Sequence, residues 1–146
     1  MTNKKALVLL VEDNADHAEL VIRSLGNAPI EKITHLTDGE LTLDYLLRRN
    51  EYAAPASSPL PQLILLDLRL PRVDGLEVLR TIKQMDKLAR IPVVVLTTSN
   101  AANDISQAYE YHANSYVVKP VGFEEFSQLM QVITDYWLGW NIRPQE

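Results

Sequence analysis

The sequence of 146 residues contains no cysteine, which excludes disulfide bonds, thiolate catalysis and cysteine-ligated zinc. It has no run of lysine and arginine, and its formal net charge of −5 disfavours electrostatic binding to nucleic acid or to an anionic membrane. No apolar run is long enough to cross a membrane, and the first one is followed by acids rather than by a small-residue cleavage site. These absences predict a cytoplasmic protein that binds neither nucleic acid nor membrane.

Glycine-rich phosphate-binding motifs are also missing. Neither GxGxxG nor GxxxxGK[ST] follows the first apolar run, which argues against dinucleotide and P-loop nucleotide binding. His17 and His35 lack the spacing of metal ligands, and we interpret them as surface or sheet residues. Metal or phosphate chemistry would therefore rest on oxygen ligands.

Short apolar runs alternate five times with segments of helical periodicity. Three of the runs are almost wholly Val, Leu and Ile, as is typical of strands buried on both faces of a parallel sheet. The clearest helical segment has apolar side chains every three or four residues from Phe123 to Trp137. This alternation predicts an α/β fold with helices on both faces of a doubly wound parallel sheet. The predicted strands are Ala6–Val11, Lys32–Leu36, Leu63–Leu66, Pro92–Leu96 and Tyr116–Val118.

One connection is longer than the others. The segment NEYAAPASSPLPQ, from Asn50 to Gln62, is rich in Pro, Ala and Ser and predicts an exposed loop before the third strand. A domain boundary there would divide the sheet, so we expect residues 1–146 to form a single domain. Residues 136–146 then form an aromatic C-terminal extension.

Polar side chains follow four of the predicted strands. Ligands of an open parallel sheet bind outside the carboxyl ends of its strands, so these side chains should converge at one edge. They are Glu12 and Asp13 after the first strand, Asp67 after the third, Thr97 and Thr98 after the fourth, and Lys119 after the fifth.

Three carboxylates at one edge repel one another strongly. Two carboxylates about 4 Å apart repel by about 4 kcal/mol at an effective dielectric constant of about 20, which a divalent cation would offset. Oxygen ligands favour Mg²⁺, with Mn²⁺ as the alternative ion. Because Mg²⁺ keeps some of its waters, the site would have room for a phosphoryl group, and Asp67 is a candidate nucleophile that would become an aspartyl phosphate. Lys119 and a threonine hydroxyl would balance the charge of the transferring group.

Each of these residues also has an ordinary structural explanation. An aspartate at the end of a strand is commonly a helix cap or a turn former, threonines cap helices, and Lys119 would be a solvated lysine. Their joint placement after four different strands favours the functional interpretation.

Four motifs resemble those of response regulator receiver domains from two-component systems. They are VEDN (Val11–Asn14), LLDLRLPRVDG (Leu65–Gly75), IPVVVLTTS (Ile91–Ser99) and YVVKP (Tyr116–Pro120). The resemblance covers about Lys5 to Tyr136 and implies a flavodoxin-like fold with strand order 2-1-3-4-5. It implies a phosphorelay protein that takes a phosphoryl group from a sensor histidine kinase and later loses it by autodephosphorylation, without the turnover of a conventional enzyme.

The resemblance also implies roles for individual residues. Asp67 would be the phosphoacceptor, and Glu12 and Asp13 would bind the metal ion together with Asp67 and the backbone carbonyl of Arg69. Lys119 would contact the phosphoryl group.

A switch is implied at the ends of the fourth and fifth strands. Thr97 would be the switch hydroxyl that moves toward the phosphoryl group, with Thr98 beside it at the phosphate-binding edge. Tyr116 would be the switch aromatic that turns inward behind Thr97, the alternative being an ordinary half-buried strand aromatic.

Arg69 and Ser99 lie two residues after Asp67 and Thr97, at positions that tune hydrolysis in receiver domains. We hypothesise that Arg69 screens the phosphoryl group from attacking water. The alternative is that Arg69 is an ordinary solvated arginine.

The sequence departs from the family pattern at His112, where the family usually has glycine. A side chain with a Cβ atom is restricted at positive φ, so we expect a different shape for the loop before the last strand. The proline-rich loop is longer than usual, and no effector domain is expected after the fifth helix. The sequence most resembles the stand-alone regulators that are paired with bacterial phytochromes, so a phytochrome is the expected kinase.

Two other functions stay open. An aspartate-nucleophile phosphohydrolase would typically carry a general acid where this chain has Arg69. A receiver-like binding module that is never phosphorylated is the second alternative, although every position of the phosphorylation set holds a competent residue.

The C-terminal segment YWLGWNIRP is unusually aromatic. Trp137 fits the apolar stripe of the last helix, and Gly139 is the expected end of that helix. Tyr136, Trp137 and Trp140 are candidate anchors of a homodimer or partner interface with an unidentified downstream protein. The alternative is that the segment folds back over its own core.

Overall fold

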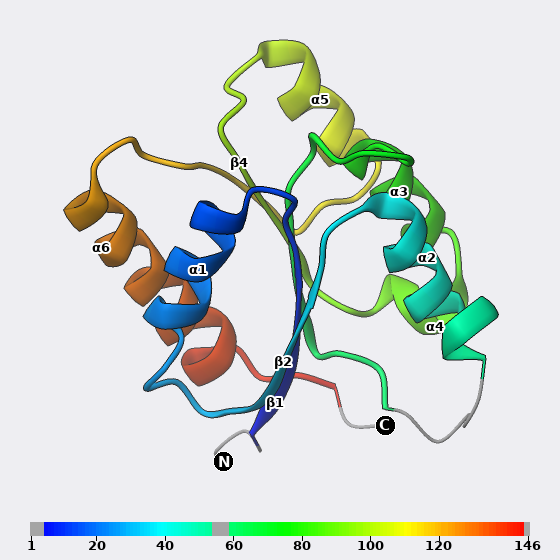
Figure 1. Ribbon diagram of the computed structural model, residues 1–146, viewed down its shortest axis with the longest axis horizontal. Coiled ribbons are helices and arrows are strands. Elements are labelled where there is room, and N and C mark those ends of the chain that lie inside the picture. Colours follow the sequence, from blue (N-terminus) through cyan, green and yellow to red (C-terminus); the bar gives the residue numbers. More distant parts are fainter. Residues whose placement is uncertain (1–4, 54–58, 145–146) are drawn as a thin grey trace.

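The computed structural model describes residues 5–53 and 59–144, and these residues contain a five-stranded sheet (Figure 1). Its order is β2-β1-β3-β4-β5, and all four neighbouring pairs are parallel, which confirms the predicted doubly wound sheet. The strands are β1 (Ala6–Val11), β2 (Ile30–Leu36), β3 (Leu63–Leu66), β4 (Val93–Thr97) and β5 (Ser115–Val118).

Helices cover both faces of this sheet (Figure 1). On one face lie α1 (Ala15–Ser24) and α6 (Phe123–Thr134); on the other lie α2 (Gly39–Leu47), α3 (Gly75–Lys83) and α5 (Ala102–Glu110). Three short elements complete the described part: η1 (Asn50–Tyr52), α4 (Asp86–Ala89) and η2 (Asp135–Trp140). Within the described ranges, no helix combines the length and the apolarity that a membrane span needs.

Several boundaries differ from the predicted ones. β2 begins at Ile30, where the amide donates to the carbonyl of Ala28 at 2.8 Å. β4 starts one residue after Pro92, which has no amide hydrogen for the sheet but accepts from the amide of Ile64 at 3.0 Å. The single turn of α4 is too short to show a helical period, and sequence analysis missed it. Of the predicted long loop, residues 54–58 lie outside the described residues.

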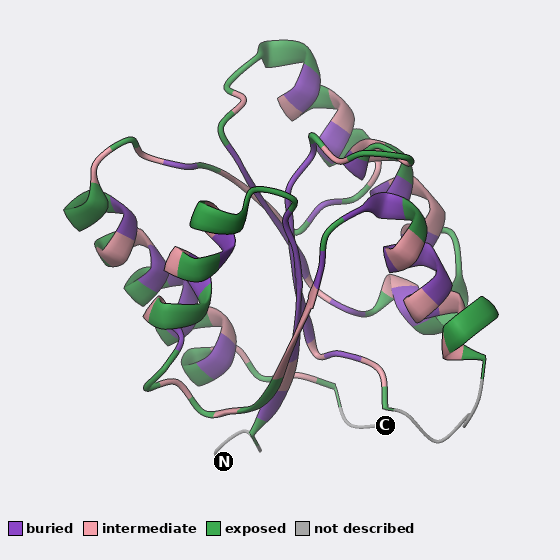
Figure 2. Ribbon diagram, viewed as in Figure 1, coloured by how far each residue is buried: buried purple, intermediate pink, exposed green. Residues whose placement is uncertain are grey.

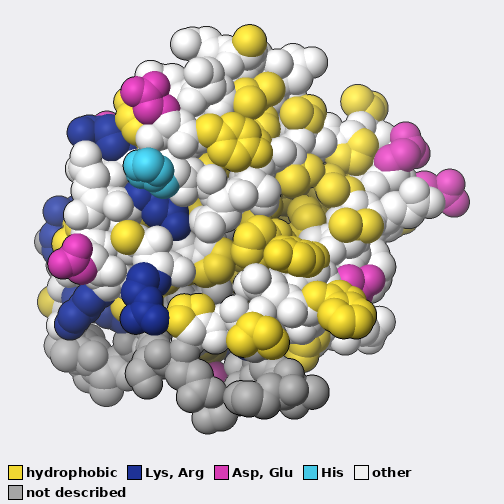
Figure 3. Space-filling view, turned by 180° about the vertical axis from the view of Figure 1, so that it is seen from behind, with side chains coloured by type: hydrophobic (Ala, Val, Ile, Leu, Met, Phe, Trp, Pro, Cys, Tyr) yellow, Lys and Arg dark blue, Asp and Glu magenta, His cyan; other side chains and the backbone are white. Residues whose placement is uncertain are grey.

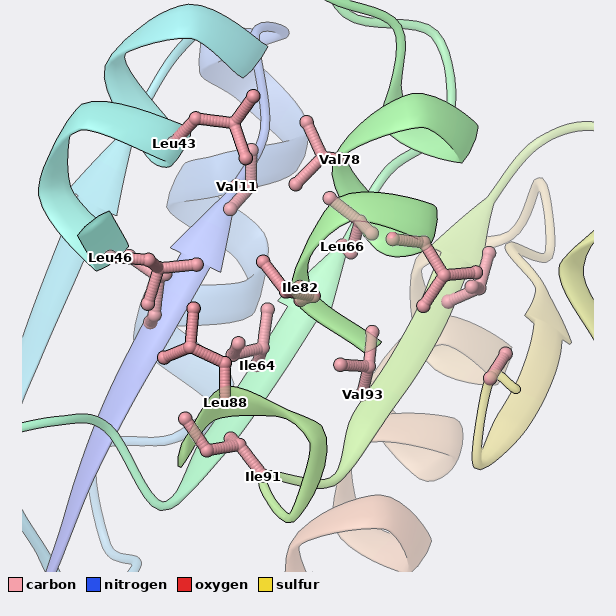
Figure 4. Close-up of a cluster of buried hydrophobic side chains, with 14 of the residues drawn as sticks. Val11, Leu43, Leu46, Ile64, Leu66, Val78, Ile82, Leu88, Ile91 and Val93 are labelled. Carbon is pink, nitrogen blue, oxygen red and sulfur yellow. The ribbon is translucent and has the colours of Figure 1, made fainter. Parts of the chain in front are cut away.

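The central strands are buried on both faces, and their side chains alternate between two cores. Leu9 and Val11 of β1 belong to the core under α2 and α3, whereas Val8 and Leu10 belong to the core under α1 and α6. Figure 2 shows the buried sheet between layers of partly exposed helices, and Figure 4 shows the first core in detail. Each fully buried Leu, Val or Ile contributes about 1.5–3 kcal/mol. The buried strands therefore fix the positions of the polar residues at their ends.

The start of α3 packs directly against the end of β3. The amide of Gly75 donates to the carbonyl of Leu68 at 2.8 Å. A Cβ atom at Gly75 would lie 2.3 Å from the carbonyl oxygen of Asp67, closer than any real contact. Only glycine therefore lets α3 begin this close to the segment that carries Asp67.

The loop before β5 forms a left-handed turn without glycine. His112 itself adopts a φ of 70°, in the region where a residue with a Cβ atom is strained by about 1–2 kcal/mol. The loop thus takes a positive φ at the position where the family usually has glycine. In this chain His112 occupies that position and carries the strain.

Candidate phosphoryl-accepting site

Three carboxylates lie together at the carboxyl edge of the sheet. Glu12 and Asp13 follow β1 and Asp67 follows β3, and one carboxylate oxygen of each lies within 4.8 Å of the others. Glu12 and Asp67 are buried, with 2% and 7% of their surface exposed, whereas Asp13 is exposed. The predicted convergence of these acids is therefore present in the fold.

This donor set fits a divalent cation. All three side chains offer oxygen, the ligand that hard divalent cations prefer, and their spacing allows one ion to contact all three. The cluster borders a surface hollow that is also lined by Asn14, His17, Arg69 and Thr98. An ion there would have an open side for waters or for a phosphoryl group. The part of the backbone carbonyl of Arg69 as a further ligand stays a prediction.

Lys119 joins two of the carboxylates. It follows β5 and is 5% exposed, and its ammonium group donates to Glu12 Oε1 at 2.5 Å and to Asp67 Oδ2 at 3.0 Å. A third partner is His17 Nδ1 at 3.0 Å. Because a lysine ammonium only donates, His17 accepts this bond through Nδ1. All three hydrogens of the buried ammonium therefore have an acceptor.

The two buried carboxylates have opposite proton affinities. Burial raises the pKa of Glu12 to about 7, although the hydrogen bond from Lys119 opposes this effect. Burial also acts to raise the pKa of Asp67, but the charge of Lys119 and hydrogen bonds from Thr97 and Lys119 outweigh it and lower that pKa. In the metal-free site Glu12 therefore takes up a proton more readily than Asp67 does.

Thr97, which the structure places as the last residue of β4 rather than after it, and Thr98, which follows it, take different positions. Thr97 is fully buried and hydrogen-bonds to Asp67, whereas Thr98 is exposed at the hollow. Tyr116 of β5 is half-buried, and its hydroxyl donates to the backbone carbonyl of Ser99 at 2.9 Å. Burial raises the pKa of the Tyr116 hydroxyl. The two predicted switch residues therefore lie on neighbouring strands, linked through the loop after β4; their switch roles stay predictions.

Arg69 and Ser99, the two predicted tuning residues, meet at one carboxylate. The guanidinium of Arg69 donates to Asp104 Oδ2, and the hydroxyl of Ser99 donates to the same oxygen at 2.5 Å. The backbone amide of Arg69 also reaches Asp67 Oδ1 at 3.3 Å. The Arg69 side chain is still 58% exposed, so Arg69 is a solvated arginine whose charged group is also paired with an acid of α5.

Sequence analysis missed His17 and Asp104 at this site. It interpreted His17 as a surface or sheet residue; His17 lies in α1 rather than in the sheet, half-buried at the surface hollow, and its contact with Lys119 was not expected. Asp104 was not singled out at all. Each is the third residue of the helix that follows a strand of the site, α1 after β1 and α5 after β4. A search of the first helical turn after each such strand would have found both.

The aromatic tail is partly core and partly surface. The expected helix end at Gly139 is wrong, because α6 continues into the π-helical turn η2 and the amide of Asn141 donates to the carbonyl of Tyr136 at 2.7 Å. Trp137 packs against the core under α6, and its ring meets that of Tyr136 edge to face at 5.0 Å. Trp140 is 82% exposed.

A further apolar side chain is exposed at the end of α6 that is remote from the tail. Phe123, which was expected in the core stripe of the last helix, is 61% exposed at the start of α6. Figure 3 shows hydrophobic side chains across the middle of the rear face and toward the α6 side, while basic side chains gather at the opposite margin. The tail therefore does not cover this apolar surface.

Comparison with known proteins identifies the family. The profile of the response regulator receiver domain matches residues 8–131. The probable methanogenesis regulatory protein FilR2 of Methanothrix harundinacea is 48% identical over 139 residues, which cover 94% of this chain and 87% of FilR2. Response regulator Rcp1 of Synechocystis is 41% identical over 138 residues, which cover 94% of this chain and 92% of Rcp1.

Solved structures extend the likeness to the whole fold. The phosphorylated cyanobacterial phytochrome response regulator RcpA matches with a TM-score of 0.91 at 38% identity, covering 97% of this chain and 99% of RcpA. The Mn²⁺-bound form of Rcp1 matches with a TM-score of 0.89 at 40% identity, covering 96% of this chain and 99% of Rcp1. The chain therefore belongs to the response regulator receiver domain family, whose members act in two-component phosphorelays, and it is homologous to phytochrome response regulators.

Proposed function

We propose that Asp67 accepts the phosphoryl group from a sensor histidine kinase. The observation that carries this proposal is the position of its carboxylate at the carboxyl edge of the sheet. The ammonium nitrogen of Lys119 lies 3.0 Å from Asp67 Oδ2, and the acids Glu12 and Asp13 lie beside it. Its lowered pKa keeps it ionised at neutral pH, as a nucleophile requires.

In the transfer, an oxygen of Asp67 forms a bond to phosphorus while the bond from phosphorus to the imidazole nitrogen of the kinase breaks. The imidazole nitrogen keeps the electron pair of that bond. The Lys119 ammonium and the Thr97 hydroxyl, both within reach of Asp67, offset the charge on the phosphoryl oxygens.

We propose Mg²⁺ as the resident ion, with Mn²⁺ as a substitute. Glu12, Asp13, Asp67 and the backbone carbonyl of Arg69 would hold it, and when bound it would neutralise charge on the phosphoryl oxygens. The Mn²⁺-bound form of the relative Rcp1 supports a divalent ion at this site.

The direct test is phosphorylation by a small donor. The purified protein is incubated with Mg²⁺ and acetyl phosphate and then weighed intact by mass spectrometry. A gain of one phosphoryl group is expected in the wild-type protein, and none in Asp67→Asn or in wild-type protein with the metal chelated. No gain in the wild-type protein would favour a receiver-like module that is not phosphorylated.

We also propose that the chain turns over no external phosphoester. An aspartate-nucleophile phosphohydrolase would need a general acid two residues after Asp67, and there Arg69 is paired with Asp104. With Mg²⁺, acetyl phosphate should phosphorylate the protein, whereas p-nitrophenyl phosphate should release no product above the Asp67→Asn background. Release from p-nitrophenyl phosphate over many turnovers that is lost in Asp67→Asn would instead establish a phosphohydrolase.

The proposed output is a shift of Thr97 toward the phosphoryl group, followed by an inward turn of Tyr116. The hydrogen bond from Tyr116 to the carbonyl of Ser99 supports this coupling, because movement of the loop after β4 changes what the tyrosine can reach. Tyr116→Ala should keep phosphorylation yet lose the response to a downstream protein. An unchanged partner response would count against it.

We propose that the kinase is a cytoplasmic phytochrome-type histidine kinase. The likeness to RcpA and Rcp1 supports this class, whereas the name of FilR2 suggests another input for that relative. Timed phosphotransfer from several purified histidine kinases, with the protein in excess, should be fastest from a phytochrome. Equal or faster transfer from an unrelated kinase would overturn the pairing.

Finally, we propose a homodimer through α6 and the tail. Tyr136 and Trp140 are exposed by 50% and 82%, and neighbouring Val132 by 65%, which is the composition of an interface centre. Because η2 also contains buried Leu138, truncation would damage the core, so point substitution is the better probe. Trp140→Glu should sediment as a monomer and the wild-type protein as a dimer; Met85→Glu, which alters an exposed apolar residue elsewhere, is the matched control.

A further inference from the structure

Asp104 is a buried carboxylate that the proposed chemistry does not use. It lies in the first turn of α5, is 7% exposed, and accepts hydrogen bonds from Arg69 and Ser99 through one oxygen, Oδ2. It is therefore the meeting point of the segment after β3 and the segment after β4.

Both partners of Asp104 also touch the phosphorylation site through their backbones. The amide of Arg69 lies 3.3 Å from Asp67 Oδ1, and the amide of Ser99 lies 3.5 Å from Thr97 Oγ1. Their side chains, by contrast, turn to Asp104. The backbones of Arg69 and Ser99 thus lie next to the site, while the guanidinium and the hydroxyl are bound to Asp104.

We propose that Asp104 is a positioning residue that competes with the phosphoryl group on Asp67 for Arg69 and Ser99. The inference rests on the proposed role of Asp67. A phosphoryl group brings a charge of about −1.5 to −2 and three strong acceptor oxygens, so it attracts the same guanidinium that Asp104 binds. A charge-assisted bond of this kind is about twice as strong as a neutral one, so neither acceptor gives up the arginine without cost.

The competition has a consequence for the lifetime of the phosphoryl group. In hydrolysis a water oxygen attacks phosphorus, the bond to Asp67 breaks with its electron pair staying on the carboxylate, and inorganic phosphate leaves as H2PO4⁻ with both protons of the water. An arginine over the phosphoryl group obstructs the water, whereas an arginine on Asp104 does not. Asp104 therefore shortens the lifetime by holding Arg69 back.

The same contacts reach the start of α5 and Tyr116. The hydroxyl of Ser99 accepts from the amide of Ala101 at 3.3 Å, directly before α5, and its carbonyl accepts from Tyr116. When Arg69 leaves Asp104, a buried carboxylate at the start of α5 loses its cationic partner. The first turn of α5 then has to rearrange, and Tyr116 is tied to the residue that moves with it.

The test is a set of phosphoryl lifetimes measured after acetyl phosphate is removed. Asp104→Asn keeps the shape of the side chain and removes its charge, and it should lengthen the lifetime by about tenfold, the factor that corresponds to 1.36 kcal/mol. Arg69→Ala should shorten the lifetime, and Asp104→Asn added to Arg69→Ala should change nothing further. Glu110→Gln, which removes one negative charge from the exposed end of the same helix, should behave as wild type.

The outcomes separate this inference from the proposed function. If Asp67 is not the acceptor, no variant gains a phosphoryl group; if only the inference is wrong, all variants gain it and Asp104→Asn has the wild-type lifetime. A lifetime that changes equally with and without Arg69 would also overturn the inference, because Asp104 would then act only on the fold. Should Asp104→Asn not fold, NMR of the Arg69 side chain in wild-type protein decides: an Nε–H signal that does not shift on adding beryllofluoride overturns it.

Discussion

Two lysines anchor opposite ends of the sheet, and their partners differ in kind. At the carboxyl end Lys119 is buried and contacts two carboxylates, Glu12 and Asp67. At the amino end Lys83, the last residue of α3, is half-buried and contacts only neutral oxygens. These are the carbonyls of Ala89 and Ile91 at 2.9 and 2.8 Å and the side chain of Asn114 at 3.0 Å.

The difference in partners indicates a chemical role for Lys119 and a structural role for Lys83. Lys119 contacts two carboxylates, which match its charge, and this is where we propose that a phosphoryl group is transferred. Among the residues that the structure describes, no anion pairs with Lys83, and burial lowers its pKa to about 8. Its hydrogen bonds instead fasten the end of α3 to the segments that start β4 and β5. A buried charge therefore indicates a reactive site only where its partners are charged as well.

The largest expected effect is that of Lys119→Met on phosphorylation. The variant loses the cation that offsets charge on the phosphoryl oxygens, and loss of one such group commonly costs about 10²–10³ in rate. The initial rate of mass gain with acetyl phosphate and Mg²⁺ measures it. Lys83→Met, the same substitution at the other end of the sheet, should be phosphorylated at the wild-type rate. An equal loss of rate in both variants would contradict a specific role for Lys119.

The second prediction concerns stability. Lys83→Met leaves the carbonyls of Ala89 and Ile91 without this donor, whereas Asn114 Oδ1 keeps its hydrogen bond from the amide of Val93. An unsatisfied buried acceptor costs about 1–3 kcal/mol. We expect the free energy of unfolding to fall by about that amount at pH 7, measured by urea denaturation. Lys87→Met, on exposed α4, is the control and should be neutral. An unchanged free energy in Lys83→Met would mean that the contacts at the amino end contribute little.

The third prediction is that the two ends respond to pH in opposite directions in metal-free protein. Glu12 has a pKa of about 7 in the native state against 4.5 in the unfolded chain, so the native state binds more protons and stability falls as pH rises through this window. Lys83 has a native pKa of about 8 against 10.5, so the unfolded chain binds more protons and stability rises from pH 8 upward.

Urea denaturation in the presence of a chelator at a series of pH values measures how the free energy of unfolding depends on pH. The curve should have a falling limb below pH 7 and a rising limb above pH 8. Glu12→Gln should flatten the limb below pH 7, and Lys83→Met should flatten the limb above pH 8. If either limb keeps its slope in the matching variant, the group assigned to that end is not the one that titrates.

The smallest expected effect is at His112, in the loop near Lys83. Replacing it by glycine removes the strain of the positive φ, and after the entropic disadvantage of glycine about 0.5–1 kcal/mol of stabilisation should remain. Urea denaturation measures the gain, and phosphorylation should be unchanged because the loop belongs to the amino end. A destabilised variant would indicate that the imidazole makes a contact more important than the strain.

The sequence predicts the site residues that follow strands better than those that lie on helices. β1 and β3 were predicted to the residue because each is an unbroken apolar run, and the acids, Thr97 and Lys119 were found because they follow such runs directly. His17 and Asp104 were missed because their side chains reach the site from helices. The rotation of a helix over a sheet is decided by packing between distant segments, which a local pattern does not contain.

The tail shows a second limit of local patterns. Gly139 was expected to end the last helix, but η2 continues past it because Leu138 is buried and Trp137 packs against the core. Tertiary packing here overrides the usual meaning of a glycine near a helix end.

The approach of α3 to Asp67 has a consequence for protein engineering. In a library that varies every position, Gly75 should tolerate no other residue, since even an alanine methyl group would displace the backbone that carries Asp67. Gly139 has nothing within 4 Å of its Cβ direction and should accept most residues. Of these two glycines, selection for signalling would thus retain Gly75 and free Gly139, because only Gly75 packs against the backbone of the proposed phosphoacceptor.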